Sequence, residues 1–374
     1  MSYKQNNYSF YVFIFGLFIW ELSSIINFMS NPNLQLVSIL RYFGLGILII
    51  SKFLNLNLTI KDRHILVTFI LATFFIINNV YFAKDSSFLE VIVLVLCSYG
   101  YNLDRIIKDY FWIRVISFSV IILLVLIGII PNQITVFNSR IRYYMGFGWP
   151  SFSSFLLFFV VLYFIWINYN TFSLLWFLLF LVINQYLYKM TDTKMPYYLT
   201  IAILLIWLFF TKSRFNFKFN FKWMIFLSLI PILLICLITY LSLNAYKFPN
   251  INNILSGRLN YGYIGINTFG IKLFGQPYYE STIPAQYFTI DSGLLRYLLH
   301  FGIISTLIML VLYQRLILKL LKQQNYIQSI VIIFCFLSAF SDPLFLNISF
   351  NLFWIVLNEL VEDDTATDEI IIKD

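Results

Sequence analysis

The stretch Ser151–Ile167, which reads SFSSFLLFFVVLYFIWI, contains no charged residue. As a helix it is close to the length that crosses the hydrocarbon core of a bilayer. Lipid offers no hydrogen-bond partner to an exposed backbone, so a segment surrounded by lipid must pair its backbone groups internally, as a helix does. Similar apolar runs recur along the chain, and together they predict an all-α membrane protein.

The composition points to the same solvent. Of the 374 residues, 60% are hydrophobic and only 11% are charged, whereas soluble domains carry about 25% charged residues. Aromatic residues make up 20%, and tyrosine and tryptophan collect where a membrane meets water. A water-soluble fold does not hide so much apolar surface, which excludes the soluble classes of enzyme and binding protein.

With about 20 residues for each crossing, the sequence predicts a polytopic transmembrane helical bundle of about twelve spans. Residues 1–360 form one integral membrane domain, with a large extracytoplasmic loop, 242–291, between spans 9 and 10. An acidic cytoplasmic tail, 361–374, follows. The predicted spans are Phe10–Phe28, Leu34–Leu54, His64–Phe82, Ser86–Leu103, Trp112–Ile130, Ser151–Ile167, Phe172–Tyr188, Tyr197–Phe210, Trp223–Leu241, Leu294–Leu312, Tyr326–Phe340 and Leu344–Leu360.

The positive charges predict the orientation. Lysine and arginine are retained preferentially in cytoplasmic loops. Most of the 25 Lys and Arg residues fall on one side if both termini are cytoplasmic. The net charge of +8 is then explained by short loops beside lipid, so we expect a membrane lipid partner and no nucleic acid.

Arginines on the outer side oppose this bias and need another explanation, of which the binding of an anion is the simplest. Arg140 and Arg142 lie two residues apart, after Ser139. In an extended segment both side chains reach one ligand, and otherwise one of them faces away. The alternative is an interfacial loop whose arginines contact lipid headgroups.

Further polar residues lie on the same predicted side. Lys194 stands before Pro196 in a short connection, and this connection can equally be an ordinary turn. Arg258 lies in the long outer loop, where the nearby Tyr261 is a candidate to stack on a sugar, and glycines make a long helix there less favourable. Asp291 precedes the tenth predicted span.

Ionisable residues inside predicted spans are functional candidates by default. Arg296 lies in the tenth span, where snorkelling to the headgroups is the alternative. His300 follows four residues later, and a single histidine among apolar residues is interpreted as a packing or hydrogen-bonded residue. Glu21 has no evident partner in sequence, although Arg41 is one candidate. Three dispersed cysteines and two histidines predict no metal site and no cofactor.

Short motifs in a fixed order resemble the Wzy-type polymerases of bacterial surface polysaccharides, which are related to O-antigen ligases. The resemblance covers roughly residues 140 to 304, and Lys194 stands where arginine is usual. The motifs are Arg142 with Gly146-Phe147-Gly148-Trp149-Pro150, then Thr191-Asp192-Thr193-Lys194, Ser256-Gly257-Arg258, Phe274-Gly275, Asp291 and Gly302-Ile303-Ile304.

The resemblance implies a GT-C-like glycosyltransferase that works without metal at the outer face of the bacterial cytoplasmic membrane. Its substrates are undecaprenyl-diphosphate-linked glycans, joined with inversion, and a chain-length regulator is a further expected partner. Arg142 and Arg258 are then expected to hold the diphosphate with support from Arg140 and Lys194. Arg296 and Tyr261 are expected to bind substrate, and Asp291 to be the base.

Three alternatives remain open. A flippase or other transporter for lipid-linked oligosaccharides is expected to carry charges inside several spans. A ligase is expected to attach finished glycan to another acceptor. A non-catalytic membrane scaffold is expected to tolerate loss of every outer arginine.

Overall fold

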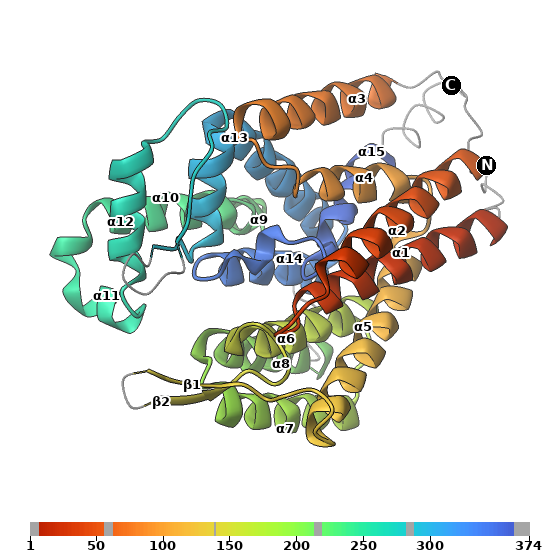
Figure 1. Cartoon of the computed structure of the whole chain (residues 1–374). Coiled ribbons are helices and arrows are strands. Elements are labelled where there is room, and N and C mark those ends of the chain that lie inside the picture. Colours follow the sequence, from red (N-terminus) through yellow and green to blue (C-terminus); the bar gives the residue numbers. More distant parts are fainter. Residues whose placement is uncertain (1–6, 56–62, 138–139, 213–218, 282–287, 363–374) are drawn as a thin grey trace. The chain divides into compact units, whose positions relative to one another are not determined.

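The computed structural model describes residues 7–55, 63–137, 140–212, 219–281 and 288–362, and it is mostly helical (Figure 1). Among the described residues, seven helices are long and apolar enough to span a membrane, or eight if one bent pair forms a single span. The prediction of an all-helical, multi-pass membrane protein is confirmed at this level. The predicted total of twelve spans is not confirmed, since several predicted spans are shorter helices or other structure. The predicted acidic tail lies almost wholly outside the described residues.

The chain divides into two compact units. The first contains Met1–Asn57 and Leu96–Phe215, and the second contains Leu58–Val95 and Asn216–Asp374. Each unit is therefore assembled from segments that are distant in sequence, and we describe each by itself.

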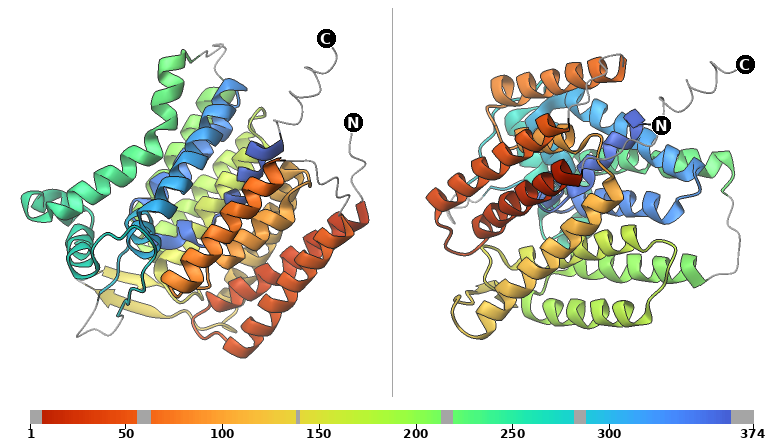
Figure 2. Two further views of the ribbon diagram at one scale, coloured as in Figure 1. Left: turned by 90° about the horizontal axis from the view of Figure 1, so that it is seen from above. Right: turned by 90° about the vertical axis from the view of Figure 1, so that its right-hand side faces the viewer.

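The first unit combines long helices with a β-hairpin. Two of its helices, α1 and α2, run side by side (Figure 2). They approach closely because Gly44 has no side chain, and a Cβ atom there would lie only 2.6 Å from the backbone nitrogen of Trp20. Small residues permit such contact between membrane helices. The elements are α1 (Asn7–Asn27), α2 (Leu34–Leu54), α5 (Leu103–Leu126), β1 (Ile134–Phe137), β2 (Arg140–Tyr143), α6 (Pro150–Ile167), α7 (Leu174–Thr191) and α8 (Lys194–Lys212).

A buried ion pair joins α1 to α5. Arg114 Nη1 lies 2.6 Å from Glu21 Oε1, and the Tyr110 hydroxyl donates to Glu21 Oε2 at 2.7 Å. Both charged side chains are essentially inaccessible. Arg114 therefore lies in the interior of the helix pair, within α5. The partner of Glu21 here is Arg114, because packing of α1 on α5 brings the two together.

The second unit is also helical among its described residues. Its longest helix, α13, packs against several of the others. The elements are α3 (Arg63–Ile76), the π-helix η1 (Ile77–Phe82), α4 (Leu89–Ser98, most of which belongs here), α9 (Phe221–Ser228), α10 (Ile230–Leu243), η2 (Ala245–Lys247), α11 (Pro249–Ile254), α12 (Arg258–Phe269), α13 (Gly293–Lys322), α14 (Tyr326–Ala339), η4 (Pro343–Leu346), η5 (Leu352–Asn358) and α15 (Glu359–Glu362).

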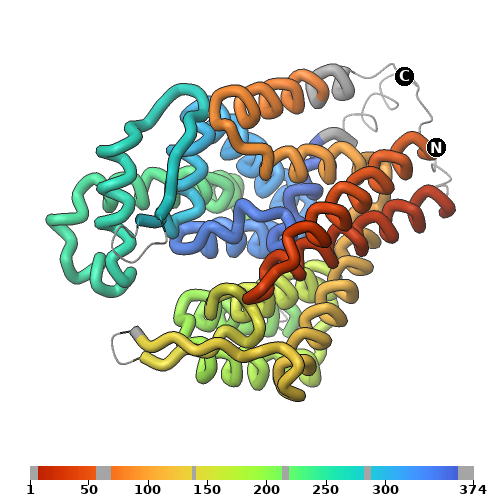
Figure 3. The backbone as a smooth tube through the Cα atoms, in the orientation of Figure 1, coloured from red at the N-terminus to blue at the C-terminus, as the bar shows by residue number. Residues whose placement is uncertain are grey.

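Helix α13 is broken at Gly302, which has a φ of 81°. The segment that follows α12 lies against this break, as the tube in Figure 3 shows. The freed amide of Ile303 donates to the Lys272 carbonyl at 2.9 Å. A side chain at position 302 would meet the Phe274 carbonyl oxygen at 2.4 Å. Irregular backbone at membrane depth is stable where protein supplies the missing hydrogen bonds.

One predicted span differs from the structure. The predicted final span, Leu344–Leu360, consists of the short helices η4 and η5 and the start of α15 rather than one continuous α-helix. The loop 242–291 contains α12, a helix of 12 residues, where the glycines had made only a long helix less favourable. These glycines give α12 a flat face, since side chains at Gly262 and Gly265 would meet Ser242 Oγ at 2.4 Å and Ile290 Cδ1 at 2.6 Å.

Candidate functional site

In the first unit, Arg140 and Arg142 lie on one face of the hairpin strand β2. The strand pairs with β1 in an antiparallel register, and residues two apart in a strand share a face. Arg142 Nε donates to the Thr191 carbonyl at 2.7 Å, and Arg140 Nη2 donates to the Asp192 carbonyl at 2.7 Å. Both guanidinium groups thus reach one target, which is the C-terminal end of α7.

The end of α7 explains why cations stand here. The last carbonyl groups of a helix lack intrahelical partners and carry partial negative charge. Arg140 also forms an ion pair with Asp192, whose left-handed conformation ends α7. Arg142 Nη2 donates to Thr193 Oγ1 at 3.1 Å. The two arginines therefore cap α7, a structural role that the sequence did not predict.

Lys194 is the first residue of α8, directly after this cap. Its side chain is exposed, and a cation at a helix N-terminus opposes the helix dipole. The sequence predicted the break just before Pro196, whereas the helices separate at residues 192 and 193 and α8 already includes Pro196. The exposed position leaves Lys194 accessible to a ligand.

In the second unit, Arg258 and Asp291 form an ion pair in which Nε and Oδ2 lie 2.9 Å apart. Arg258 opens α12, after Gly257 with a φ of 85°, and Asp291 stands just before α13. About a third of each side chain is exposed. The second carboxylate oxygen of Asp291 accepts from Thr289 Oγ1 at 3.2 Å. The residues predicted to be the diphosphate clamp and the base are thus direct partners.

A second carboxyl group, that of Asp342, belongs to the same electrostatic neighbourhood. It lies between α14 and η4, where its Oδ1 accepts from the Leu344 amide at 3.0 Å. Burial raises the pKa of Asp342 to about 7, against the lowering effects of that hydrogen bond and of Arg258 and Arg296, while Asp291 raises it. Asp342 was not among the predicted site residues, because an acidic residue after an apolar run indicates no more than the end of a helix.

Arg296, one turn inside α13, pairs with Glu280. Its Nη2 lies 2.5 Å from Glu280 Oε2, while Glu280 Oε1 accepts from the Ile290 amide at 2.9 Å. The guanidinium also lies 5.7 Å from the centre of the Tyr278 ring. Arg296 is therefore held inside the protein by a partner that the sequence analysis did not identify.

His300 bridges three segments of the second unit. Its Nε2 lies 2.9 Å from Asp85 Oδ2, and its Nδ1 lies 3.0 Å from the Gln276 carbonyl oxygen. Asp85 follows η1 and lies 215 residues from His300 in sequence. His300 is thus a hydrogen-bonded residue that connects distant segments, in agreement with its interpretation from the sequence as a packing or hydrogen-bonded residue.

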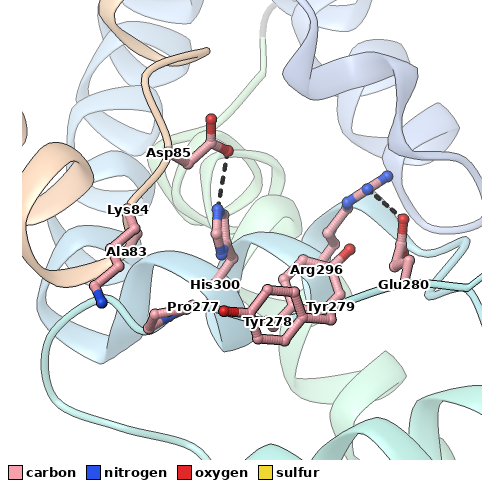
Figure 4. A pocket seen from close by; sticks show the side chains of 9 residues that line it. All are labelled: Ala83, Lys84, Asp85, Pro277, Tyr278, Tyr279, Glu280, Arg296 and His300. Carbon is pink, nitrogen blue, oxygen red and sulfur yellow. Dashed lines mark hydrogen bonds and ion pairs between the residues drawn. The ribbon is translucent and has the colours of Figure 1, made fainter.

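These side chains line a cavity of about 330 Å³, shown in Figure 4. Its wall includes the Arg296–Glu280 ion pair and the contact of His300 with Asp85, together with Tyr278 and Tyr279. The volume is at the small end of the range for ligand pockets. Lined mainly by charged and aromatic groups, the cavity suits a small polar ligand.

The predicted site residues fall into two groups. Arg140, Arg142 and Lys194 belong to the first unit, and Arg258, Tyr261, Asp291 and Arg296 belong to the second. Within the second, Tyr261 lies three residues after Arg258 on α12, so both side chains share a helix face. Among the described residues, no group of three or more His, Cys, Asp or Glu side chains is arranged to hold a metal ion.

Comparison with protein-family models, with curated protein sequences and with solved structures finds no match to this chain. The function is therefore inferred from the chemistry of the site and from the motif resemblance.

Proposed function

We propose that this chain is a glycosyltransferase that polymerises undecaprenyl-diphosphate-linked oligosaccharide repeat units at the outer face of a bacterial cytoplasmic membrane. The observation that carries the proposal is the Arg258–Asp291 ion pair beside the first turn of α13, a helix long and apolar enough to span a membrane. It joins a cation suited to a diphosphate with a carboxylate suited to accept a proton.

The proposed reaction uses both members of the pair. A bound diphosphate competes with Asp291 for the guanidinium of Arg258, and this frees the carboxylate. The acceptor hydroxyl oxygen then bonds to the anomeric carbon of the donor sugar as the bond from that carbon to the diphosphate oxygen breaks. The hydroxyl proton passes to Asp291, while Arg258 stabilises the charge on the departing diphosphate.

Other residues support this scheme in different ways. Asp342 is a second carboxyl group near Arg258, and its pKa of about 7 suits proton transfer near neutral pH. The first unit carries its own cations, Arg142, Arg140 and Lys194, and we propose that they bind phosphate groups of a lipid-linked substrate. The proposal includes twelve spans, both termini in the cytoplasm and a chain-length regulator as a partner.

Replacement of Arg258 by Ala tests the proposal. In the producing bacterium, we expect single repeat units on the cell surface and loss of long polysaccharide chains. Arg258→Lys keeps the charge without the two-pronged geometry and is expected to restore chain length only in part. Lys247→Ala is the matched control, because Lys247 is an exposed cation in the same loop. Chains of wild-type length in Arg258→Ala would refute the proposal.

One observation favours a second candidate, a transporter of lipid-linked oligosaccharides. The Glu21–Arg114 pair is fully buried between helices α1 and α5, and buried charge within a membrane protein often marks a transport path. If the chain is a transporter, its inactivation is expected to leave lipid-linked repeat units on the cytoplasmic side. If it is a ligase, its inactivation is expected to leave long chains attached to the carrier lipid. The location and length of the accumulated glycan therefore separate the three activities.

A further inference from the structure

The cavity in the second unit is formed by three segments. The turn after η1 supplies Lys84 and Asp85, the chain before α13 supplies residues 277–280, and α13 itself supplies Arg296 and His300. Figure 4 shows that the ring of His300 points toward Asp85 and that the Arg296 side chain points toward Glu280. The cavity is therefore polar at both ends, with tyrosine rings beside them.

The carboxylates of the cavity wall already have partners. Asp85 Oδ2 lies 2.9 Å from Nε2 of His300, and Nδ1 of the same ring lies 3.0 Å from the Gln276 carbonyl oxygen. Burial acts to raise the pKa of Asp85, but hydrogen bonds from His300 and Ser87 outweigh it and lower the pKa to about 2. Asp85 is therefore ionised and faces the His300 ring.

One further cation lines the cavity. Glu280 pairs with Arg296, and Asp85 contacts the ring of His300. Lys84 also lines the cavity, its side chain is exposed, and no ion pair to it is found among the described residues. Lys84 is thus the cation that a ligand is free to neutralise, which favours a ligand with one negative charge.

The remaining lining groups favour a sugar ring over a bare anion. Sugar hydroxyl groups donate and accept hydrogen bonds, and the carboxylates of Asp85 and Glu280 accept while Arg296 donates. The ring of Tyr279, which is largely exposed, offers an apolar surface with a polar tip. A cavity of about 330 Å³ accommodates a small saccharide.

We propose that this cavity binds a carboxylate-bearing sugar of the lipid-linked glycan, with Lys84 as the partner of the carboxylate. The assignment of the ligand as a sugar rests on the proposed function. The anion-binding chemistry is shared with a phosphate of the carrier lipid, so the experiment must separate these two sources.

Binding to the purified full chain in lipid nanodiscs provides the test. The probes are glucuronate and glucose, which differ by a carboxylate against a hydroxymethyl group, and inorganic phosphate. Saturation-transfer NMR titrations at low ionic strength report each affinity. We expect glucuronate to bind about fivefold more tightly than glucose, the size of effect for an exposed ion pair.

Lys84→Asn is the decisive variant. The backbone of Lys84 has a φ of 55°, a conformation that asparagine adopts more readily than most residues, so the fold is preserved while the charge is removed. We expect its glucuronate affinity to fall to that of glucose, with glucose binding unchanged. Lys247→Asn, which removes an exposed cation elsewhere, is expected to leave both affinities unchanged.

Three outcomes would overturn the assignment. They are equal binding of glucuronate and glucose to wild type, an unchanged preference in Lys84→Asn, and phosphate that binds more tightly than glucuronate and displaces it. Any of these can occur while polymerisation still depends on Arg258, and then the proposed function stands without this subsite. Conversely, a Lys84-dependent preference in a protein whose Arg258→Ala variant makes normal chains supports the subsite and refutes only the polymerase proposal.

Discussion

Arg258 and Asp291 are 33 residues apart in sequence, yet Nε of the arginine donates a 2.9 Å hydrogen bond to the aspartate carboxylate. The pairing joins the first residue of α12 to the residue before the N-cap of α13. In the proposed reaction, a diphosphate that takes over the guanidinium also releases the carboxylate from its partner.

The Asp291→Asn variant tests this coupling. We expect loss of polymerisation with little loss of stability, below about 1 kcal/mol, because the pair is partly exposed. Asp342→Asn is the comparison, since Asp342 is the second carboxyl group of the neighbourhood. The measurements are polysaccharide chain length and thermal unfolding in nanodiscs. Long chains in Asp291→Asn together with none in Asp342→Asn would transfer the role of base to Asp342.

The raised pKa of Asp342 predicts a pH dependence of stability. Its folded-state pKa is about 7 against the ordinary aspartate value of 3.8, so the unfolded chain loses this proton first as pH rises. The contribution of Asp342 to stability should therefore be lost progressively between about pH 4 and pH 7. In Asp342→Asn, which keeps an acceptor for the Leu344 amide, this part of the pH dependence should vanish. If the melting temperatures of the wild type and of Asp342→Asn change with pH to the same extent across that range, the prediction is contradicted.

Arg142 is predicted to stabilise the first unit as well as to serve the proposed reaction. Arg142→Ala removes hydrogen bonds to the Thr191 carbonyl and to the Thr193 hydroxyl, and we expect a loss of about 2 kcal/mol. Thermal unfolding and protease sensitivity near residue 192 measure this loss. Ile141→Ala is the control on the same strand, because Ile141 is exposed and points to the opposite face. Equal stability of the two variants would show that capping of α7 is unimportant.

Gly302→Ala is predicted to destabilise the second unit by more than about 2 kcal/mol. The backbone conformation at this position is nearly restricted to glycine, and the new methyl group would collide with the Phe274 carbonyl oxygen. Gly46→Ala is a matched control in α2, since a methyl group there meets no atom within 4 Å. That control should be neutral or slightly stabilising. A wild-type melting temperature for Gly302→Ala would argue against the break in α13.

The buried Glu21–Arg114 pair is expected to be sensitive to loss of one partner. Arg114→Met leaves an uncompensated carboxylate between α1 and α5, and we expect it to cost about 3–5 kcal/mol. The double variant Glu21→Gln with Arg114→Met removes both charges and should recover much of that stability. Expression level and thermal unfolding provide the measurements. If the double variant is no more stable than the single one, the pair does not act as a unit.

Much of the helical framework could be predicted because hydropathy reports the solvent. The predicted span Ser151–Ile167 differs from α6 by one residue at its start, and Leu34–Leu54 coincides with α2. Hydropathy did not predict the structure of Leu344–Leu360, which is apolar but does not form a continuous α-helix. Side chains of the same segment satisfy backbone groups there, as when Asn351 Nδ2 donates to the Phe345 carbonyl at 3.1 Å.

The sequence by itself determined that lipid is the solvent, since residues so rarely charged cannot form a wetted surface, and it located most helices through the length of each apolar run. It also identified Arg142, Arg258 and Asp291 as unusual charges. Their partners follow from the tertiary structure, because ion pairs such as Arg258 with Asp291 join segments that are separate in the chain. Short-range sequence patterns encode the helices, whereas the pairing of charges depends on packing that brings polar atoms of distant segments to about 3 Å from each other.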